Sequence, residues 1–194
     1  MNTTIEADDY DEEFEARASE VVKIFQTDKK VTRYDIYLDD DFDMPSADYR
    51  ELFHKLQEAN ERDVVNIHLA SFGGACHVGF QVCHAVKDCK AHTIITVEQP
   101  CYSMGAILAC CGDKLVMKPG TLLMMHNYSG GSRGKGGEML MGAKHQDRWL
   151  HESFKYFASP FLTDAELEAM KKDQDIYIHA SDRNLKSRMR RHFK

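Results

Sequence analysis

The chain has 194 residues, carries a formal net charge of −6 and is 43% hydrophobic. This length suits one domain with a substantial core, and no apolar run approaches the roughly 20 residues that a membrane-spanning helix needs. The amino end also lacks the charged-then-apolar pattern of a secretory signal. We therefore expect a soluble, cytoplasmic protein with no membrane partner.

Charge is distributed unevenly along the chain, and this divides it into three parts. Residues 1–30 form an acidic segment that is either a short amphipathic helix or a flexible arm. Residues 31–180 carry the apolar patterning of a folded domain. Residues 181–194 form a basic tail, which is more typical of a solubilising terminus than of a nucleic-acid site, so we expect no nucleic-acid partner.

Hydrophobic periodicity predicts alternating strands and helices in the central part. The predicted strands are residues 34–38, 64–69, 93–97, 114–117 and 122–125. The predicted helices are residues 46–59, 76–89, 104–111, 138–158 and one that begins at Thr163. Strand–helix–strand alternation favours parallel pairing through right-handed crossovers, so the predicted fold class is α/β.

Ser103 is the first candidate for a reactive residue. It stands between the predicted strand at 93–97 and the predicted helix at 104–111. Free N–H groups and the helix dipole favour negative charge at a helix N-terminus, which suits the nucleophile of an acyl transfer. The alternative is that Ser103 only caps the helix and that Gly105 and Ala106 are small because the helix is tightly packed.

Two further stretches support the reactive interpretation. The pair Gly73 and Gly74 follows the strand at 64–69, where a sharp turn can aim backbone N–H groups at a ligand and form half of an oxyanion hole. His126 directly follows the strand at 122–125 and precedes a glycine-rich loop. That position suits a general base.

Four motifs occur together in one order along the chain. They are Ser71-Phe-Gly-Gly74, Tyr102-Ser-Met-Gly-Ala106, Met124-Met-His126 with the following Gly130-Gly131, and Asp175-Ile-Tyr-Ile-His-Ala180. In these motifs and their spacing the chain resembles the proteolytic subunit of the Clp protease, the ClpP family of serine peptidases. The resemblance implies a ClpP/crotonase-like fold of repeated strand-strand-helix units with a projecting handle helix.

The resemblance also implies a role for each matched residue. Ser103 would be the nucleophile, His126 the general base and Asp175 the carboxylate that orients the imidazole. The backbone N–H groups of Gly74 and Met104 would form the oxyanion hole.

The activity implied is that of a serine endopeptidase that cleaves unfolded proteins and peptides through an acyl-enzyme, with no cofactor. Its sites would line a homo-oligomeric chamber made of one heptameric ring or two stacked rings. The chain has no Gly-x-x-x-x-Gly-Lys-Ser/Thr loop, so ATP would be used by a partner AAA+ unfoldase.

Two departures from the family pattern bear on ring pairing and partner docking. Phe72 stands where the family commonly has proline, and Gln174 stands where it often has arginine. Two other functions stay open. One is a non-catalytic ring subunit, and the other is a crotonase-like acyl-CoA enzyme of the same superfold.

The six cysteines raise two further alternatives. Cys76, His77, Cys83 and His84 are interleaved at helical spacing, but zinc ligands usually come in tighter pairs, so we expect no metal site. Cys101 stands two residues before Ser103 and is a rival nucleophile. Without an export signal, the cysteines are expected to be reduced, buried thiols.

Overall fold

The structure is a computed structural model that describes residues 31–193, so the prediction for the acidic segment 1–30 lies outside the described residues. The strands are β1 (Arg33–Leu38), β2 (Val64–Leu69), β3 (His92–Val97), β4 (Cys101–Tyr102), β5 (Lys114–Met117), β6 (Leu122–Met125) and β7 (Ile176–His179). The helices are the 3-10 turn η1 (Ser46–Tyr49), α2 (Arg50–Glu58), α3 (Cys76–Asp88), α4 (Met104–Leu108), α5 (Gly136–Ala158), α6 (Asp164–Lys171) and α7 (Leu185–His192).

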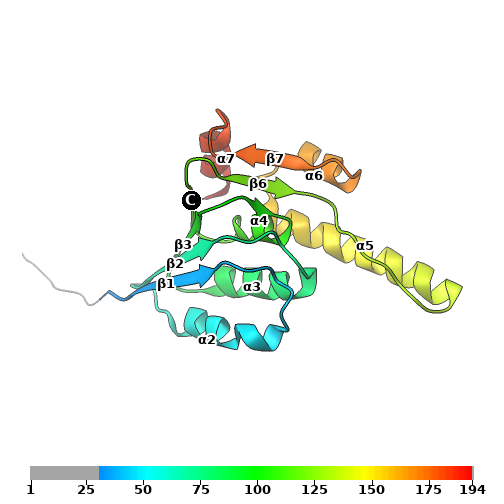
Figure 1. Ribbon diagram of the computed structural model, residues 1–194, viewed down its shortest axis with the longest axis horizontal. Coiled ribbons are helices and arrows are strands. Elements are labelled where there is room, and N and C mark those ends of the chain that lie inside the picture. The colour runs from blue at the N-terminus through cyan, green and yellow to red at the C-terminus, as the bar shows by residue number, and fades with distance from the viewer. Residues whose placement is uncertain (1–30, 194) are drawn as a thin grey trace, which may run out of the picture. The chain divides into compact units, whose positions relative to one another are not determined.

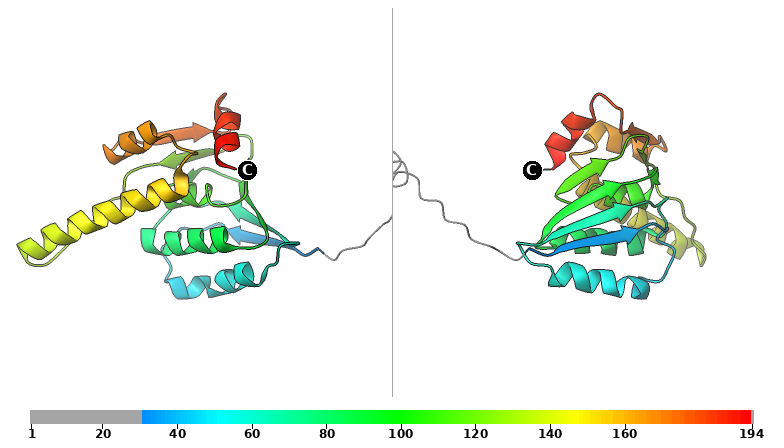
Figure 2. Two further views of the ribbon diagram at one scale, coloured as in Figure 1. Left: turned by 180° about the vertical axis from the view of Figure 1, so that it is seen from behind. Right: turned by 60° about the vertical axis from the view of Figure 1, so that its left-hand side comes forward.

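A four-stranded parallel sheet forms one half of the fold, with strand order β1-β2-β3-β5. Helices α2 and α3 lie along one face of this sheet (Figures 1 and 2). Parallel strands joined by helical crossovers are the arrangement that the alternating sequence pattern predicted. The predicted α/β class is thus confirmed.

A second sheet of three strands has the order β4-β6-β7. Strand β6 is parallel to β4 and antiparallel to β7. The sequence analysis predicted neither β4, which has two residues, nor β7, which has four. Such short strands are stabilised by pairing with a neighbour rather than by their own periodicity.

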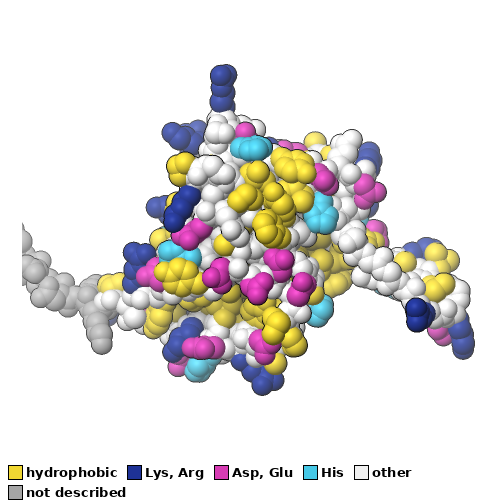
Figure 3. All heavy atoms as spheres, in the orientation of Figure 1, with side chains coloured by type: hydrophobic (Ala, Val, Ile, Leu, Met, Phe, Trp, Pro, Cys, Tyr) yellow, Lys and Arg dark blue, Asp and Glu magenta, His cyan; other side chains and the backbone are white. Residues whose placement is uncertain are grey.

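The outward faces of the two sheets differ in chemistry. The four-stranded sheet carries a hydrogen-bonded set of side chains on its strands and just beyond their ends, here called the polar face: Asp35, Asn66, His68, Thr96, Glu98 and Lys118. On β4, β6 and β7, strand register places Tyr102, Met124 and Tyr177 in one row. Figure 3 shows the charged and histidine side chains over β1 and β2 and a hydrophobic area over β6 and β7.

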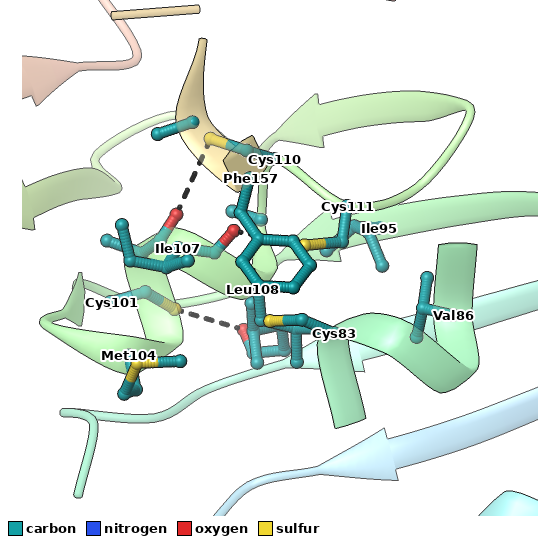
Figure 4. Packing of buried hydrophobic residues seen from close by; sticks show 14 of the residues in the cluster. Cys83, Val86, Ile95, Cys101, Met104, Ile107, Leu108, Cys110, Cys111 and Phe157 are labelled. Atoms are coloured by element: carbon teal, nitrogen blue, oxygen red, sulfur yellow. Dashed lines mark hydrogen bonds between the residues drawn. The ribbon is translucent and has the colours of Figure 1, made fainter. Parts of the chain in front are cut away.

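The core lies between the four-stranded sheet and its helices and extends beneath the three-stranded sheet. Ile67, Ile95 and Leu108 are fully buried, and Phe157 from α5 packs over Cys83 and Cys111 (Figure 4). Burial raises the pKa of the Cys83 thiol well above its ordinary value. Four of the six cysteines are buried as predicted, but the prediction is wrong for Cys76 and Cys89 at the two ends of α3, which are half-buried.

Helix α5 projects from the rest of the described chain (Figures 1 and 2). Its carboxyl end is anchored in the core by Leu150, Phe154 and Phe157, whereas Leu140 and Met141 near its amino end are exposed. This matches the handle helix that the resemblance implied. Within residues 31–193, no helix combines the length and apolar composition needed to cross a membrane.

The basic carboxyl-terminal segment differs from the sequence-based expectation, which gave it no helix. Residues 185–192 form α7, and Leu185 and Arg188 on its inner side are buried. The Arg188 guanidinium pairs with Glu166 and donates to the carbonyl oxygen of Phe161. His192 Nδ1 accepts from the Phe161 N–H at 3.2 Å, its Nε2 lies 2.6 Å from the Cys110 carbonyl oxygen, and burial lowers its pKa. Apolar and buried polar contacts therefore order a segment whose composition suggested a solvated tail.

Helix α4 ends at Leu108, three residues before its predicted end. The N–H groups of Cys110 and Cys111 bond to the carbonyls of Ile107 and Leu108, three residues back instead of four. This tightened turn ends the helix and leads into β5.

Candidate active site

Ser103 occupies the sharp connection between β4 and α4. Its backbone has φ 53° and ψ −124°, a conformation that side-chain-bearing residues rarely adopt. The Ser103 N–H donates to the Met124 carbonyl at 2.8 Å, and its carbonyl accepts from the Ile107 N–H at 3.1 Å. These bonds on both sides hold the strained residue in place.

The side chain of Ser103 makes no capping hydrogen bond to α4. The alternative that Ser103 serves only as an N-cap therefore lacks its defining contact. Gly105 is small for a reason of packing, because a Cβ there would overlap the carbonyl oxygen of Ser71.

The glycine turn after β2 packs directly against Ser103. Gly73 has φ 114°, and a Cβ added to it would lie 2.6 Å from the Cβ and 3.1 Å from the Oγ of Ser103. Gly74 has φ 119° and faces the backbone of Phe42 instead. Only glycine satisfies both the backbone conformation and the close approach at position 73.

Several backbone donors near Ser103 have no partner within residues 31–193, and two of them are of interest here. They are the N–H groups of Gly74 and of Met104, the first residue of α4. The first N–H groups of a helix have no acceptor inside it, so Met104 is free for structural reasons. Both residues are those that the resemblance assigned to an oxyanion hole.

Asp41 organises the glycine turn, and sequence reasoning missed it. Its Oδ1 accepts from the Phe72 N–H at 2.7 Å and from the Ser71 hydroxyl at 3.3 Å. The Gly73 N–H in turn donates to the Ser71 Oγ at 3.1 Å. The available signal was the acidic loop after β1, because the carboxyl ends of parallel neighbouring strands meet at one edge of a sheet.

Strand register places His126 and Asp175 at the same end of the β6–β7 pair. In the antiparallel pair β6–β7, Met125 stands opposite Ile176, so the same register continued by one residue sets His126 opposite Asp175. Both lie at the end of the three-stranded sheet where β6 finishes and β7 begins (Figure 1). The hydrogen bond from the Ser103 N–H to the Met124 carbonyl places Ser103 beside this end of β6.

The three side chains differ in exposure. Ser103 and His126 are half-buried, and Asp175 is exposed. Among the hydrogen bonds of residues 31–193, none joins the side chains of these three residues to one another. The fold thus collects the three predicted residues at one end of one sheet without closing the hydrogen-bond chain between them.

The cysteine alternatives find little support in the geometry. Burial raises the pKa of Cys101 to about 11, so this residue stays a thiol at neutral pH, and its Sγ contacts the Leu69 carbonyl at 3.6 Å. Within the described part of the chain, no three His, Cys, Asp or Glu side chains are grouped to hold a metal ion. His84 packs its ring edge against Phe157.

Comparison with models of protein families shows which family this chain belongs to, because the model described as Clp protease matches residues 17–184. The chain belongs to the Clp protease family. Comparison with curated proteins gave no match. The Clp protease match includes every strand from β1 to β7 and ends just before α7. Membership supports a peptidase at the level of the family and favours it over the acyl-CoA alternative.

Proposed function

We propose that this Clp protease family member is a serine endopeptidase in which Ser103, His126 and Asp175 act as a catalytic triad. The observation that supports the proposal is the strained Ser103 turn, whose hydroxyl makes no capping bond, beside a β6–β7 register that, continued by one residue, sets His126 opposite Asp175. A serine hydroxyl is a poor nucleophile at neutral pH until an imidazole accepts its proton.

In the proposed reaction, the Ser103 Oγ bonds to the carbonyl carbon of the substrate while His126 takes the hydroxyl proton. Asp175 orients the imidazole and stabilises its protonated form. The oxyanion of the tetrahedral intermediate would accept hydrogen bonds from the N–H groups of Gly74 and Met104. Each such donor contributes about 3 to 4 kcal/mol to transition-state stabilisation in serine peptidases.

Breakdown of this intermediate breaks the C–N bond, and the departing amine takes the proton from His126. Water then adds to the Ser103 ester, with His126 as base, and releases the acid product and the free serine. Water is the only co-reactant of the two steps, so the proposed reaction needs no cofactor.

The assembly belongs to the same proposal. Handle helix α5 carries exposed Leu140 and Met141, at 58% and 56% of full exposure, which suit a contact with another subunit. We propose a cytoplasmic homo-oligomer of heptameric rings that admits peptides and receives larger unfolded substrates from an AAA+ unfoldase. A variant lacking residues 130–137, which include most of the glycine-rich loop and the first two residues of α5, should then sediment as a different oligomer. An unchanged distribution would contradict the handle assignment.

The test of the activity is intact-mass analysis after treatment with a fluorophosphonate probe. The parent protein should gain one adduct per chain, and Ser103→Ala should gain none while keeping its oligomeric mass. Absence of an adduct on a folded, ring-sized parent would instead support a non-catalytic ring subunit.

A further inference from the structure

The segment that follows His126 is tied down on two sides. Asn127 Nδ2 donates to Asp173 Oδ1 at 2.8 Å, and the Tyr128 hydroxyl donates to Asp147 Oδ1 at 3.1 Å. The first bond reaches the turn before β7, and the second reaches helix α5. Both anchors lie within two residues of His126.

The Asn127 bond joins the two chain segments that supply the base and its orienting carboxylate. Asp173 precedes Asp175 by two residues and has φ 61°, with its N–H bonded to the Met170 carbonyl at 3.0 Å. This left-handed residue ends the turn after α6 and fixes the direction in which the chain enters β7.

The Tyr128 bond is supported by a third side chain. His151 Nδ1 lies 2.8 Å from the Asp147 carbonyl oxygen and 3.3 Å from its Oδ1. The His151 ring meets the Tyr128 ring edge to face, with centroids 5.8 Å apart. Burial and the bond to Asp147 raise the pKa of Tyr128, so its hydroxyl remains a donor at neutral pH.

Beyond Tyr128 the chain loses these restraints. Residues 129–135, which connect Tyr128 to α5, are exposed, and three of the seven are glycine, the residue with the greatest backbone freedom. His126 therefore stands at the boundary between a paired strand and a loop with few restraints. The hydrogen bond of Tyr128 therefore limits how far motion of the loop can displace the His126 imidazole.

We infer that Tyr128 and Asp147 form a positioning pair that holds His126 in register with Asp175. The inference rests on the proposed function, because it needs His126 to be the base. It also links α5 to the reactive centre through one hydrogen bond. Misplacement of a catalytic group by about 1 Å can cost on the order of a hundredfold in rate, so one lost anchor has a measurable effect.

The test uses the full-length oligomer and four single variants. Tyr128→Phe removes only the hydroxyl, and Tyr156→Phe is the matched control, an exposed tyrosine of α5 that lies away from the site. Asp147→Ala removes the acceptor, whereas Asp147→Asn retains an acceptor oxygen. Peptide hydrolysis, the rate of fluorophosphonate labelling and sedimentation are measured for each.

We expect Tyr128→Phe and Asp147→Ala to lower kcat and the labelling rate about tenfold with KM within about twofold, since positioning acts on the transition state. Asp147→Asn should recover most of the rate, and Tyr156→Phe should equal the parent. The double variant Tyr128→Phe/Asp147→Ala should be no slower than the slower single variant, because both remove one bond.

The two proposals fail in different ways. A parent that neither labels nor cleaves overturns the proposed function and this inference with it. A parent that labels at Ser103 while Tyr128→Phe behaves like Tyr156→Phe overturns the positioning pair alone. Rate losses that multiply in the double variant, or that follow loss of oligomer, would also overturn it.

Discussion

The two sheets of this protein are built from neighbouring parts of one chain but differ in strand length and in what lies at the strand ends. In the four-stranded sheet, β1, β2 and β3 each have six residues, and the face toward the helices includes Ile67 and Ile95, both with no exposed surface. In the three-stranded sheet the strands have two to four residues, and the candidate catalytic residues lie just beyond their ends. Leu123 and Ile178 of the second sheet are also fully buried, so apolar burial stabilises both sheets. The second sheet differs because register and loop contacts at its strand ends position the candidate residues.

Their outward faces extend the contrast. On the polar face, His68 lies between Asp35 and Glu98, and the hydrogen bond to Glu98 raises the His68 pKa. The carboxylates and Lys118 are partly solvated, so their ion pairs contribute little to stability, whereas Asn66 and Thr96 are buried and hydrogen-bonded to each other. On the second sheet Phe72 packs on Tyr102 with ring centroids 5.1 Å apart, immediately beside Ser103. Changes in the first sheet should therefore alter stability, and changes at the ends of the second should alter rate.

The largest expected effect is on rate and comes from the end of β7. Asp175→Asn should lower kcat about 10⁴-fold, because an amide no longer stabilises the imidazolium or holds its tautomer. Asp175 is exposed, so the free energy of unfolding should change by less than about 0.5 kcal/mol. Peptide hydrolysis measures kcat, and urea unfolding measures the free energy of unfolding. Asp88→Asn, an exposed carboxylate at the end of α3, serves as control; equal rates for both variants would contradict the triad.

The converse change is made in the core of the first sheet. Ile67→Ala should lower the free energy of unfolding by about 2 to 5 kcal/mol, since it removes fully buried methylene groups and leaves a cavity. Chains that remain folded should keep their kcat. Ile94→Ala on β3, where the side chain is only partly buried, should cost clearly less. Comparable losses from the two variants would show that the sheet is not stabilised by its buried face.

A smaller effect that touches both stability and rate is expected at α4. Gly105→Ala places a Cβ against the Ser71 carbonyl oxygen and should destabilise the fold by about 1 to 3 kcal/mol through overpacking. The displaced Ser71 should also disturb the glycine turn, so kcat should fall in the folded fraction. Gly142→Ala in α5, where no atom lies within 4 Å, should instead be neutral or stabilising. A stable, fully active Gly105→Ala variant would refute this packing.

The smallest expected effect concerns the pH dependence of stability at α7. The bond to Arg188 lowers the pKa of Glu166 to about 2, so the pair stabilises the fold above the ordinary carboxyl pKa of about 4.3. That contribution is lost as pH falls toward 2. Glu166→Gln should remove about 1 kcal/mol at neutral pH, because partial exposure screens the pair, and should flatten the acid side of the stability profile. The exposed Glu168→Gln variant should keep the parental slope.

Local sequence patterns were sufficient for most of the fold. The strands β2, β5 and β6 match the predicted residues, and α3 and α5 differ from them by one or two residues at an end. Their apolar residues recur at spacings that suit only one burial geometry, so each segment specifies its own structure. The order of the four motifs likewise identified the family without any knowledge of tertiary contacts.

The contacts around the candidate site depend on tertiary structure. The antiparallel pairing of β7, the bond from Asp41 to the glycine turn, and the anchors at Asn127 and Tyr128 each join residues far apart in the chain. No periodicity encodes such pairings, because each partner is specified only when distant segments are brought together by burial of the core. The sequence by itself determined which residues are candidates for a serine peptidase site, and the tertiary structure decided that their positions lie at one end of one short sheet.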